Sequence, residues 1–213
     1  MQRIAVIDYG MGNLRSVSRA LERVAPGDEI VVSDSAEVIG ASDRIVCPGQ
    51  GAARDCMAAL HASGLGQVVV DTVDSRPFLG ICMGLQVLLG RSEENGGVAC
   101  LGVVPGRVRR FADPPRAADG TRLKVPHMGW SPVRQARPHA LWRGIEDGTR
   151  FYFAHSYVCE PDDAALAVGT CDHGGEFAAA LAYPGFFACQ FHPEKSSRDG
   201  LRLLAIFVAW DGR

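Results

Sequence analysis

The chain has 213 residues, of which 47% are hydrophobic and 22% are charged, and its formal net charge is -2. This length and composition are typical of a globular protein with a substantial core, and they exclude the disordered and fibrous classes. Because the near-neutral charge creates no field that gathers polyanions, we expect no nucleic-acid partner and no membrane association, but a small molecule or a protein partner.

The first half of the sequence alternates short β-branched runs with helical stretches. Predicted strands and helices follow one another in pairs, at 4–7 and 14–24, at 29–32 and after Ser33, at 44–47 and 54–61, and at 77–82 and 83–89. Strands that alternate with helices of this length indicate parallel βαβ units, in which helices cover both faces of the sheet.

After about Gly96 the sequence changes to short strand-like runs separated by Gly, Pro and Asp. These runs, which we expect to be antiparallel, cover 101–111, 122–133, 150–159 and 178–191, and a closing helix follows Ser196. We therefore predict one domain over residues 1–213 with an α/β, three-layer fold. Its central sheet is expected to be mostly parallel and to carry additional antiparallel strands.

The cysteines and the N-terminus indicate the compartment. There are 7 cysteines, an odd number, and most of them lie inside apolar runs without any CxxC pair. This pattern is typical of free thiols in a reducing compartment, and it predicts no metal site. Residues 1–7 form a strand pattern without the apolar core of a signal peptide, and no apolar run reaches transmembrane length, so we expect a cytoplasmic protein.

Cys82 is the candidate nucleophile. It lies in Gly80-Ile-Cys-Met-Gly84, where an apolar strand meets an apolar helix. A nucleophile on such a sharp turn takes a positive φ, and small neighbours let the strand and the helix approach each other. The start of the following helix would favour the thiolate. Taken alone, the motif is equally consistent with a buried structural cysteine beside a helix-packing glycine.

His192 and Glu194 are the candidate base and its orienting group. They flank Pro193 directly after the strand-like run 186–191. Residues i and i+2 of extended backbone face the same side, so the carboxylate can orient the imidazole, as in a catalytic triad. Taken alone, His-Pro-Glu is more often a turn with a solvated carboxylate.

Gly49, Gln50 and Gly51 are the candidate oxyanion loop, because they end one predicted strand and open a helix. Their backbone N–H groups could stabilise a developing oxyanion, although an ordinary strand-to-helix turn would also explain them. The three motifs together favour acyl transfer. Residues 10–15 suggest a dinucleotide loop, but Arg15 replaces its third glycine, so we expect a turn or interface element and no cofactor.

Longer motifs point to a family. Residues 48–51, 80–86 and 192–194 together resemble the class I glutamine amidotransferase pattern over nearly the whole chain. Residues 8–14, 126–130, 153–157 and 192–196 are similar to the glutaminase subunits of imidazole glycerol phosphate synthase. Gln50 and Ser131 occupy positions where valine and asparagine are common in that family.

The resemblance implies a function. It implies hydrolysis of L-glutamine to glutamate and ammonia through a thioester on Cys82. The ammonia would pass to a separate cyclase subunit, a (β/α)₈ barrel, in a heterodimer that makes imidazole glycerol phosphate and aminoimidazole carboxamide ribotide (AICAR) in histidine biosynthesis. By the same resemblance the glutamine-binding residues are Gln86, Glu94, His155, Ser156 and Tyr157, and the residues near the partner are Asn13, Trp130 and Lys195.

Three other functions stay open. A stand-alone cysteine hydrolase, such as a γ-glutamyl peptidase, would share the triad but work without a partner. A catalytically idle binding subunit would keep the fold and would not need Cys82. The glutaminase of vitamin B6 synthesis shares the triad, but we do not expect it to carry the 126–130 motif.

Overall fold

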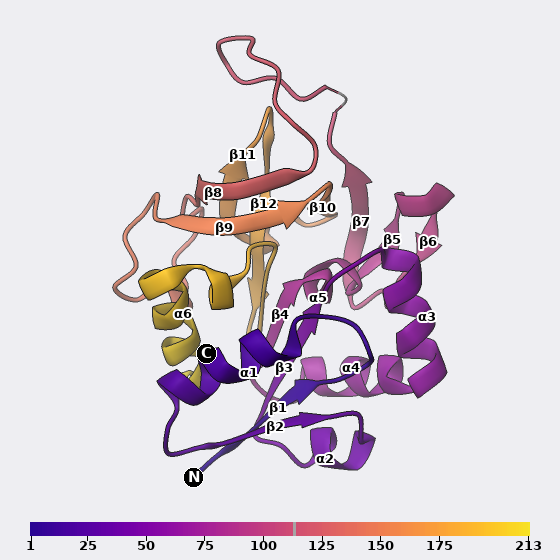
Figure 1. Cartoon of the computed structure of the whole chain (residues 1–213), viewed down its shortest axis with the longest axis vertical. Helices are drawn as coiled ribbons and strands as arrows, with labels where there is room; N and C mark the ends of the chain where they lie inside the picture. The colour runs from indigo at the N-terminus through magenta and orange to yellow at the C-terminus, as the bar shows by residue number, and fades with distance from the viewer. Residues whose placement is uncertain (113) are drawn as a thin grey trace.

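The computed structural model describes residues 1–112 and 114–213. Within these residues a mixed 11-stranded sheet forms the centre of the molecule (Figure 1). Strand β11 (Ala167–Asp172) pairs with β12 outside the main path. The main path runs through β2 (Glu29–Ser33), β1 (Arg3–Ile7), β3 (Arg44–Gly49), β4 (Phe78–Cys82), β13 (Phe186–Cys189), β12 (Glu176–Tyr183), β10 (Tyr157–Pro161), β7 (Val104–Arg110), β5 (Leu89–Ser92) and β6 (Val98–Ala99).

The path from β2 to β13 is parallel, and alternation along its strands produces two cores. In β1, Ile4 and Val6 belong to one buried cluster, and Ala5 and Ile7 to the other. Successive side chains of a strand point to opposite faces, so each face needs its own cover of helices. One face packs on α1 (Leu14–Val24) and α6 (Ser197–Ala209), and the other on α2 (Ala36–Gly40), α3 (Ala53–Ser63) and α4 (Leu65–Val73).

The other half of the sheet is largely antiparallel. Strand β12 pairs antiparallel with β13, β10 and β11, and β7 pairs antiparallel with β10 but parallel with β5. A separate two-stranded ribbon of β8 (His127–Pro132) and β9 (Arg150–His155) crosses this region (Figure 1). The predicted three-layer α/β fold, with a parallel centre and added antiparallel strands, is confirmed.

Several boundaries differ from the prediction. The helix expected over 83–89 is only α5 (Met83–Gln86), and the chain is a strand again from Leu89. Met83 to Leu89 are all buried, so apolar periodicity could not separate helix from strand there. The expected strands 150–159 and 178–191 are each divided into two, and α4 was not predicted. Short 3₁₀ helices are η1 (Glu94–Gly96), η2 (Ala140–Trp142), η3 (Ala164–Leu166) and η4 (Pro193–Lys195).

In the part of the chain that the structure describes, no individual helix has both the length and the apolar composition needed to cross a membrane. Helices α3 and α4 meet that test only when taken together, across a bend of 94°.

Candidate active site

Cys82 occupies a strained turn between β4 and α5. Its backbone has φ 56° and ψ -107°, a region that residues with a side chain rarely adopt, so the predicted positive φ is confirmed. The neighbouring glycines make the turn possible. A Cβ on Gly84 would overlap the carbonyl oxygen of Cys47, and a Cβ on Gly80 would lie 2.7 Å from the Gly84 oxygen.

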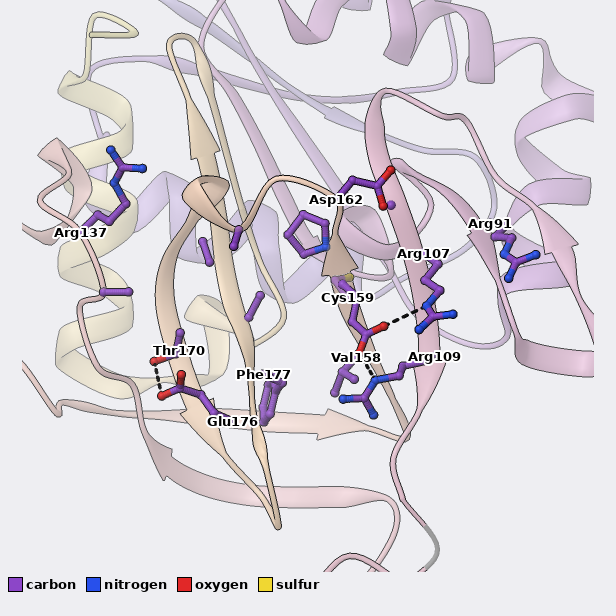
Figure 2. A pocket seen from close by; sticks show the side chains of 17 residues that line it. Arg91, Arg107, Arg109, Arg137, Val158, Cys159, Asp162, Thr170, Glu176 and Phe177 are labelled. Carbon is purple, nitrogen blue, oxygen red and sulfur yellow. Dashed lines mark hydrogen bonds and ion pairs between the residues drawn. The ribbon is translucent and has the colours of Figure 1, made fainter.

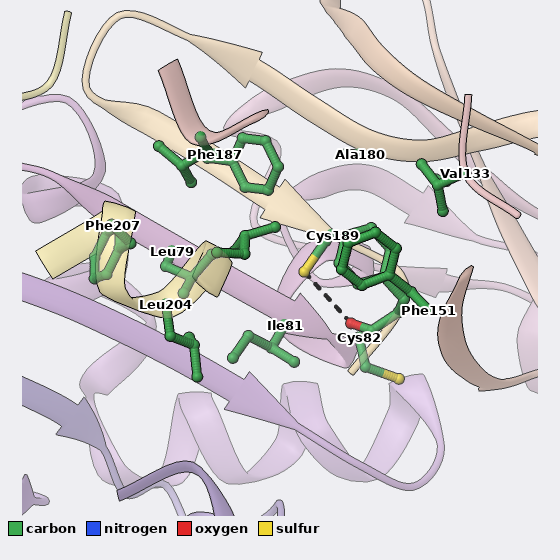
Figure 3. Packing of buried hydrophobic residues seen from close by; sticks show 14 of the residues in the cluster. Leu79, Ile81, Cys82, Val133, Phe151, Ala180, Phe187, Cys189, Leu204 and Phe207 are labelled. Carbon is green, nitrogen blue, oxygen red and sulfur yellow. Dashed lines mark hydrogen bonds between the residues drawn. The ribbon is translucent and has the colours of Figure 1, made fainter. Parts of the chain in front are cut away.

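The apolar core supports this turn from behind. Cys82 is 5% exposed and lies at the edge of a buried cluster that also contains Ile81, Phe151 and Cys189 (Figure 3). Close packing on this side leaves the sulfur little freedom to change its position. A nucleophile has to be held in a defined position in this way.

His192 and Glu194 form a buried pair. The His192 Nδ1 atom lies 2.9 Å from Glu194 Oε1, and the two side chains are 3% and 1% exposed. The backbone here is fixed as well. The His192 N–H donates to the Tyr152 carbonyl at 2.9 Å, and the Ser196 hydroxyl donates to the His192 carbonyl at 2.6 Å. The carboxylate lies against the ring, as the sequence predicted, but Glu194 belongs to the 3₁₀ helix η4 and not to the extended backbone on which that prediction rested.

The His192 ring lines the same cavity as Cys82. Burial alone lowers the pKa of His192, but hydrogen bonds to Cys82 and Glu194, with the Coulombic attraction of both, raise it to about 9. Because Nδ1 faces Glu194, the Nε2 atom is the one left for the sulfur. The site therefore favours a protonated imidazole beside the sulfur at neutral pH.

The loop 49–51 lies against this turn. A Cβ on Gly49 would lie 2.7 Å from Met83 Cβ and would overlap the Tyr9 hydroxyl, so only glycine fits there. Gly51 has φ 96°, which also favours glycine. The Gln50 carbonyl accepts a hydrogen bond from the Cys56 thiol at 3.4 Å, which fixes one side of the loop.

A cavity of about 280 Å³ opens over Cys82 and brings together most of the predicted site. Residues from distant parts of the sequence line it, among them three that were not predicted: Met83, Pro126 and Ala154. The predicted residues in the lining are Gln50, Gly51, Cys82, Gln86, Glu94, His155, Ser156, Tyr157, His192 and Lys195.

Other predicted residues lie outside the cavity lining. Glu194 contacts the His192 ring on the Nδ1 side, and Gly49 packs against Tyr9 and Met83 at the start of the loop 49–51. Asn13 is half-buried, and its side-chain oxygen caps α1 by accepting from the Ser16 N–H at 3.3 Å. Trp130 is 44% exposed on β8, and its neighbour Met128 is 64% exposed.

Polar contacts inside the cavity involve a residue that the sequence analysis missed. The Gln86 Nε2 atom donates to the Tyr157 carbonyl at 3.3 Å and to Gln190 Oε1 at 2.9 Å, and Gln190 Nε2 reaches the Cys82 sulfur at 3.7 Å. Gln86 Oε1 is buried without a hydrogen-bond partner among the described residues. Gln190 falls in an apolar strand-like run, where a single polar residue two positions before His192 was the only signal.

Two neutral histidines support the cavity wall. The Tyr157 carbonyl accepts from His155 Nδ1 at 2.8 Å, so His155 Nε2 is the acceptor for His127 Nδ1 at 3.0 Å, and Ser131 donates to His127 Nε2 at 2.8 Å. Burial, followed by repulsion from His173, lowers the pKa of His127 to about 4. Burial is also the main cause that lowers the pKa of His155 to about 3.

A larger cavity of about 950 Å³ lies elsewhere, over the antiparallel half of the sheet (Figure 2). Four arginines and three acidic residues line it, and two of these arginines, Arg107 and Arg109, pair with Glu160, so its lining is close to neutral overall. Neither Cys82 nor His192 lines it. The smaller cavity is therefore the candidate active site, because the candidate nucleophile Cys82 and the candidate base His192 both line it.

Comparisons with known proteins agree with this geometry. The chain matches the family model described as glutamine amidotransferase class-I over residues 5–209. The imidazole glycerol phosphate synthase subunit HisH of Dechloromonas aromatica is 56% identical over 210 residues, which cover 98% of this chain and 97% of the relative. Subunit HisH 1 of Pseudomonas aeruginosa is 56% identical over 213 residues, which cover 100% of this chain and 99% of the relative.

Solved structures share the fold. The structure of PurLQS from Thermotoga maritima superposes with a TM-score of 0.72 over 98% of this chain and 99% of that chain. The sequence identity is 18%, so this likeness concerns the fold alone.

Proposed function

This chain belongs to the class I glutamine amidotransferases and, within them, to the HisH subunits of imidazole glycerol phosphate synthase, and we propose that it hydrolyses L-glutamine with Cys82, His192 and Glu194 as its triad. One observation carries the proposal. The buried His192–Glu194 pair, 2.9 Å apart, and the Cys82 sulfur lie at one small cavity, which both Cys82 and His192 line. We treat residues 1–213 as a single catalytic domain.

The first half-reaction forms a thioester. The Cys82 thiolate attacks the side-chain carbonyl carbon of glutamine, and the N–H groups of the loop 49–51 stabilise the resulting oxyanion. When the intermediate collapses, the C–N bond breaks and His192 gives its proton to the departing ammonia. A pKa of about 9 keeps His192 protonated before the attack, as this step requires.

The second half-reaction releases glutamate. Neutral His192 takes a proton from water, and the resulting hydroxide attacks the thioester carbon and breaks the C–S bond. Glu194 stabilises the imidazolium and holds its tautomer during both steps. The thiolate and the imidazolium are then restored.

Buried polar groups support glutamine as the substrate. The Gln86 Oε1 atom has no partner among the described residues, so it can accept a hydrogen bond from the substrate ammonium group. Glu94 lines the same cavity and adds a carboxylate on that side, although its Oε2 atom also accepts from the Ala53 N–H at 2.6 Å. Residues 155–157 complete the pocket for the amino-acid end.

A cyclase subunit is the proposed partner. Ammonia released by this reaction serves a synthesis only if another active site receives it, and the relatives are named as subunits of a synthase. We propose a (β/α)₈ cyclase that makes imidazole glycerol phosphate and AICAR in histidine biosynthesis. Exposed Trp130, with Asn13 and Lys195, would lie at the contact. All 7 cysteines are free, which supports a cytoplasmic location.

The test is a reconstitution. The chain is mixed with a purified cyclase subunit, its ribonucleotide substrate and glutamine. Cys82→Ala should abolish glutamine-dependent synthesis while added ammonium still supports it, and Cys100→Ala, at a half-buried cysteine outside the cavity lining, should change neither. Full activity of Cys82→Ala would contradict the proposal, and rapid glutamate release without a partner would favour a stand-alone hydrolase.

A further inference from the structure

Gln190 is a fully buried polar residue directly behind the nucleophile. It follows β13 and is 0% exposed, and its backbone N–H donates to the Ala179 carbonyl at 2.9 Å. Its side-chain amide lies between two site residues, with Oε1 at 2.9 Å from Gln86 Nε2 and Nε2 at 3.7 Å from the Cys82 sulfur. If the buried amide lost these contacts, its unsatisfied polar atoms would destabilise the folded state by their full desolvation free energy.

The hydrogen-bond pattern fixes which end of each amide faces which neighbour. The Tyr157 carbonyl can only accept, so the Gln86 atom that faces it must be the NH₂ group. That same NH₂ group faces Gln190, which must therefore present its oxygen to Gln86. The NH₂ group of Gln190 is then the end that faces the sulfur.

We propose that Gln190 is a positioning residue that holds the Cys82 sulfur with one end of its amide and Gln86 with the other. This inference rests on the proposed role of Cys82 as the nucleophile. An N–H group that donates to sulfur stabilises the thiolate relative to the thiol, because only the thiolate is a strong acceptor. The same side chain then joins the nucleophile to the residue proposed to bind the substrate.

The local helix does not provide this stabilisation by itself. The sequence suggested that a helix over 83–89 would favour the thiolate, but α5 contains only Met83–Gln86. A macrodipole is the sum of aligned peptide units, so a single turn contributes little. The Gln190 amide is the group whose hydrogen bond to the sulfur the described residues show, at 3.7 Å.

The test measures how readily Cys82 is alkylated as the pH changes. The full-length chain is treated with iodoacetamide at a series of pH values, and modification of the Cys82 peptide is quantified by mass spectrometry. Gln190→Met keeps the side-chain size but removes the N–H donor. Gln190→Asn keeps the amide, but its side chain is one methylene shorter, so the amide lies farther from the sulfur. Gln135→Met is the matched control, because it also removes a half-buried amide that donates to a backbone carbonyl, that of Ile145 at 2.7 Å.

Both Gln190 variants should raise the pH midpoint of alkylation by about one unit, which is tenfold less thiolate below the midpoint. In the complex with the cyclase subunit, Gln190→Met should also lower kcat for glutamate release about tenfold and raise the KM for glutamine, because Gln86 loses its anchor. Gln135→Met should leave the midpoint unchanged. A purely structural Gln190 would alter the unfolding midpoint without moving the alkylation midpoint.

The inference is overturned if either Gln190 variant, folded by circular dichroism, alkylates with the midpoint of the unsubstituted chain. The Asn variant protects the test against a Met variant that fails to fold. This failure differs from failure of the proposed function, which would appear as absent glutamate release from the unsubstituted complex, because the alkylation measurement needs no turnover.

Discussion

The Glu194 carboxylate lies 2.9 Å from Nδ1 of His192, and neither side chain is more than 3% exposed. A carboxylate buried this deeply is costly unless a cation pairs with it, and the His192 ring is that partner. The ring and Cys82 line the same cavity, and Cys82 also helps to raise the pKa of His192. Glu194 thus orients the imidazole and stabilises its protonated form beside the group proposed to attack glutamine.

Replacement of that carboxylate by an amide should impair catalysis with little change in shape. Glu194→Gln removes the charge that raises the pKa of His192, so kcat should fall roughly 10²–10⁴-fold. The alkaline limb of the pH profile, expected near the His192 pKa of about 9, should move to lower pH. Glutamate release by the complex, measured from pH 6 to pH 10, checks both effects.

Glu22→Gln is the control for this change, because Glu22 is exposed on α1 and lies outside the cavity lining. It should leave the profile unaltered. An alkaline limb that does not move in Glu194→Gln would show that Glu194 does not set the protonation of His192.

The pKa values of the buried histidines should be shifted in opposite directions from the ordinary histidine value. His192 should stay protonated up to a pH of about 9, whereas His127 and His155 should stay neutral down to pKa values of about 4 and about 3. In the unfolded chain all three should titrate at about 6.5. His127 and His155 therefore bind fewer protons folded than unfolded below pH ~6.5, so their contribution to stability is lost as the pH falls from there.

Ring resonances of ¹³C-labelled histidine, followed from pH 5 to pH 10, check these assignments one by one. A His127 or His155 resonance that titrates near pH ~6.5, the ordinary histidine value, would contradict the neutral, directed pair.

The tight turn around Cys82 should not tolerate a methyl group. Gly84→Ala would force a Cβ into the Cys47 carbonyl oxygen, so we expect a loss of about 3 kcal/mol in the free energy of unfolding or a failure to fold. Gly40→Ala adds the same methyl group in α2, where nothing lies within 4 Å. It should be neutral or stabilise by up to ~1 kcal/mol. Urea unfolding followed by circular dichroism compares the two, and equal stabilities would contradict the packing described for the turn.

The exposed tryptophan should matter for assembly only. Trp130→Ala should weaken binding of the cyclase subunit by about 30-fold, because exposed tryptophans that become buried in interfaces are often hot spots worth ~2 kcal/mol. Val32→Ala provides the matched control, since Val32 is 42% exposed on β2 and Trp130 is 44% exposed on β8. Calorimetric titration measures both affinities. Unchanged binding by Trp130→Ala would move the contact away from β8.

Local patterns in the sequence were sufficient for most of the parallel half of the fold, apart from α4 and the extent of α5, and for the main chemical groups. Helix Leu14–Val24 was predicted with its observed bounds, because its apolar spacing is a local feature. The turn at Cys82 was predicted because glycine spacing acts over a few residues. The pair at His192 and Glu194 was predicted because the two residues are close in the sequence, although Glu194 lies in a 3₁₀ helix and not on the expected extended backbone.

Features that depend on distant contacts were not predicted. Gln190 could be recognised only once Gln86 and Cys82, which are far from it in the sequence, were brought against it. The neutral His127 and His155 pair likewise joins two strands of a ribbon whose pairing no local pattern indicates. The short α5 was missed because complete burial removes the periodicity by which helices are identified.

The identity of the nucleophile is tested most directly by covalent labelling. The complex of the chain with its cyclase subunit is treated with a glutamine-shaped chloroketone, and the labelled peptide is identified by mass spectrometry. We predict a single adduct on Cys82 that forms in step with the loss of glutamate release, and that excess glutamine prevents. An adduct on any of the other cysteines that abolishes glutamate release while Cys82 stays unmodified would contradict the account.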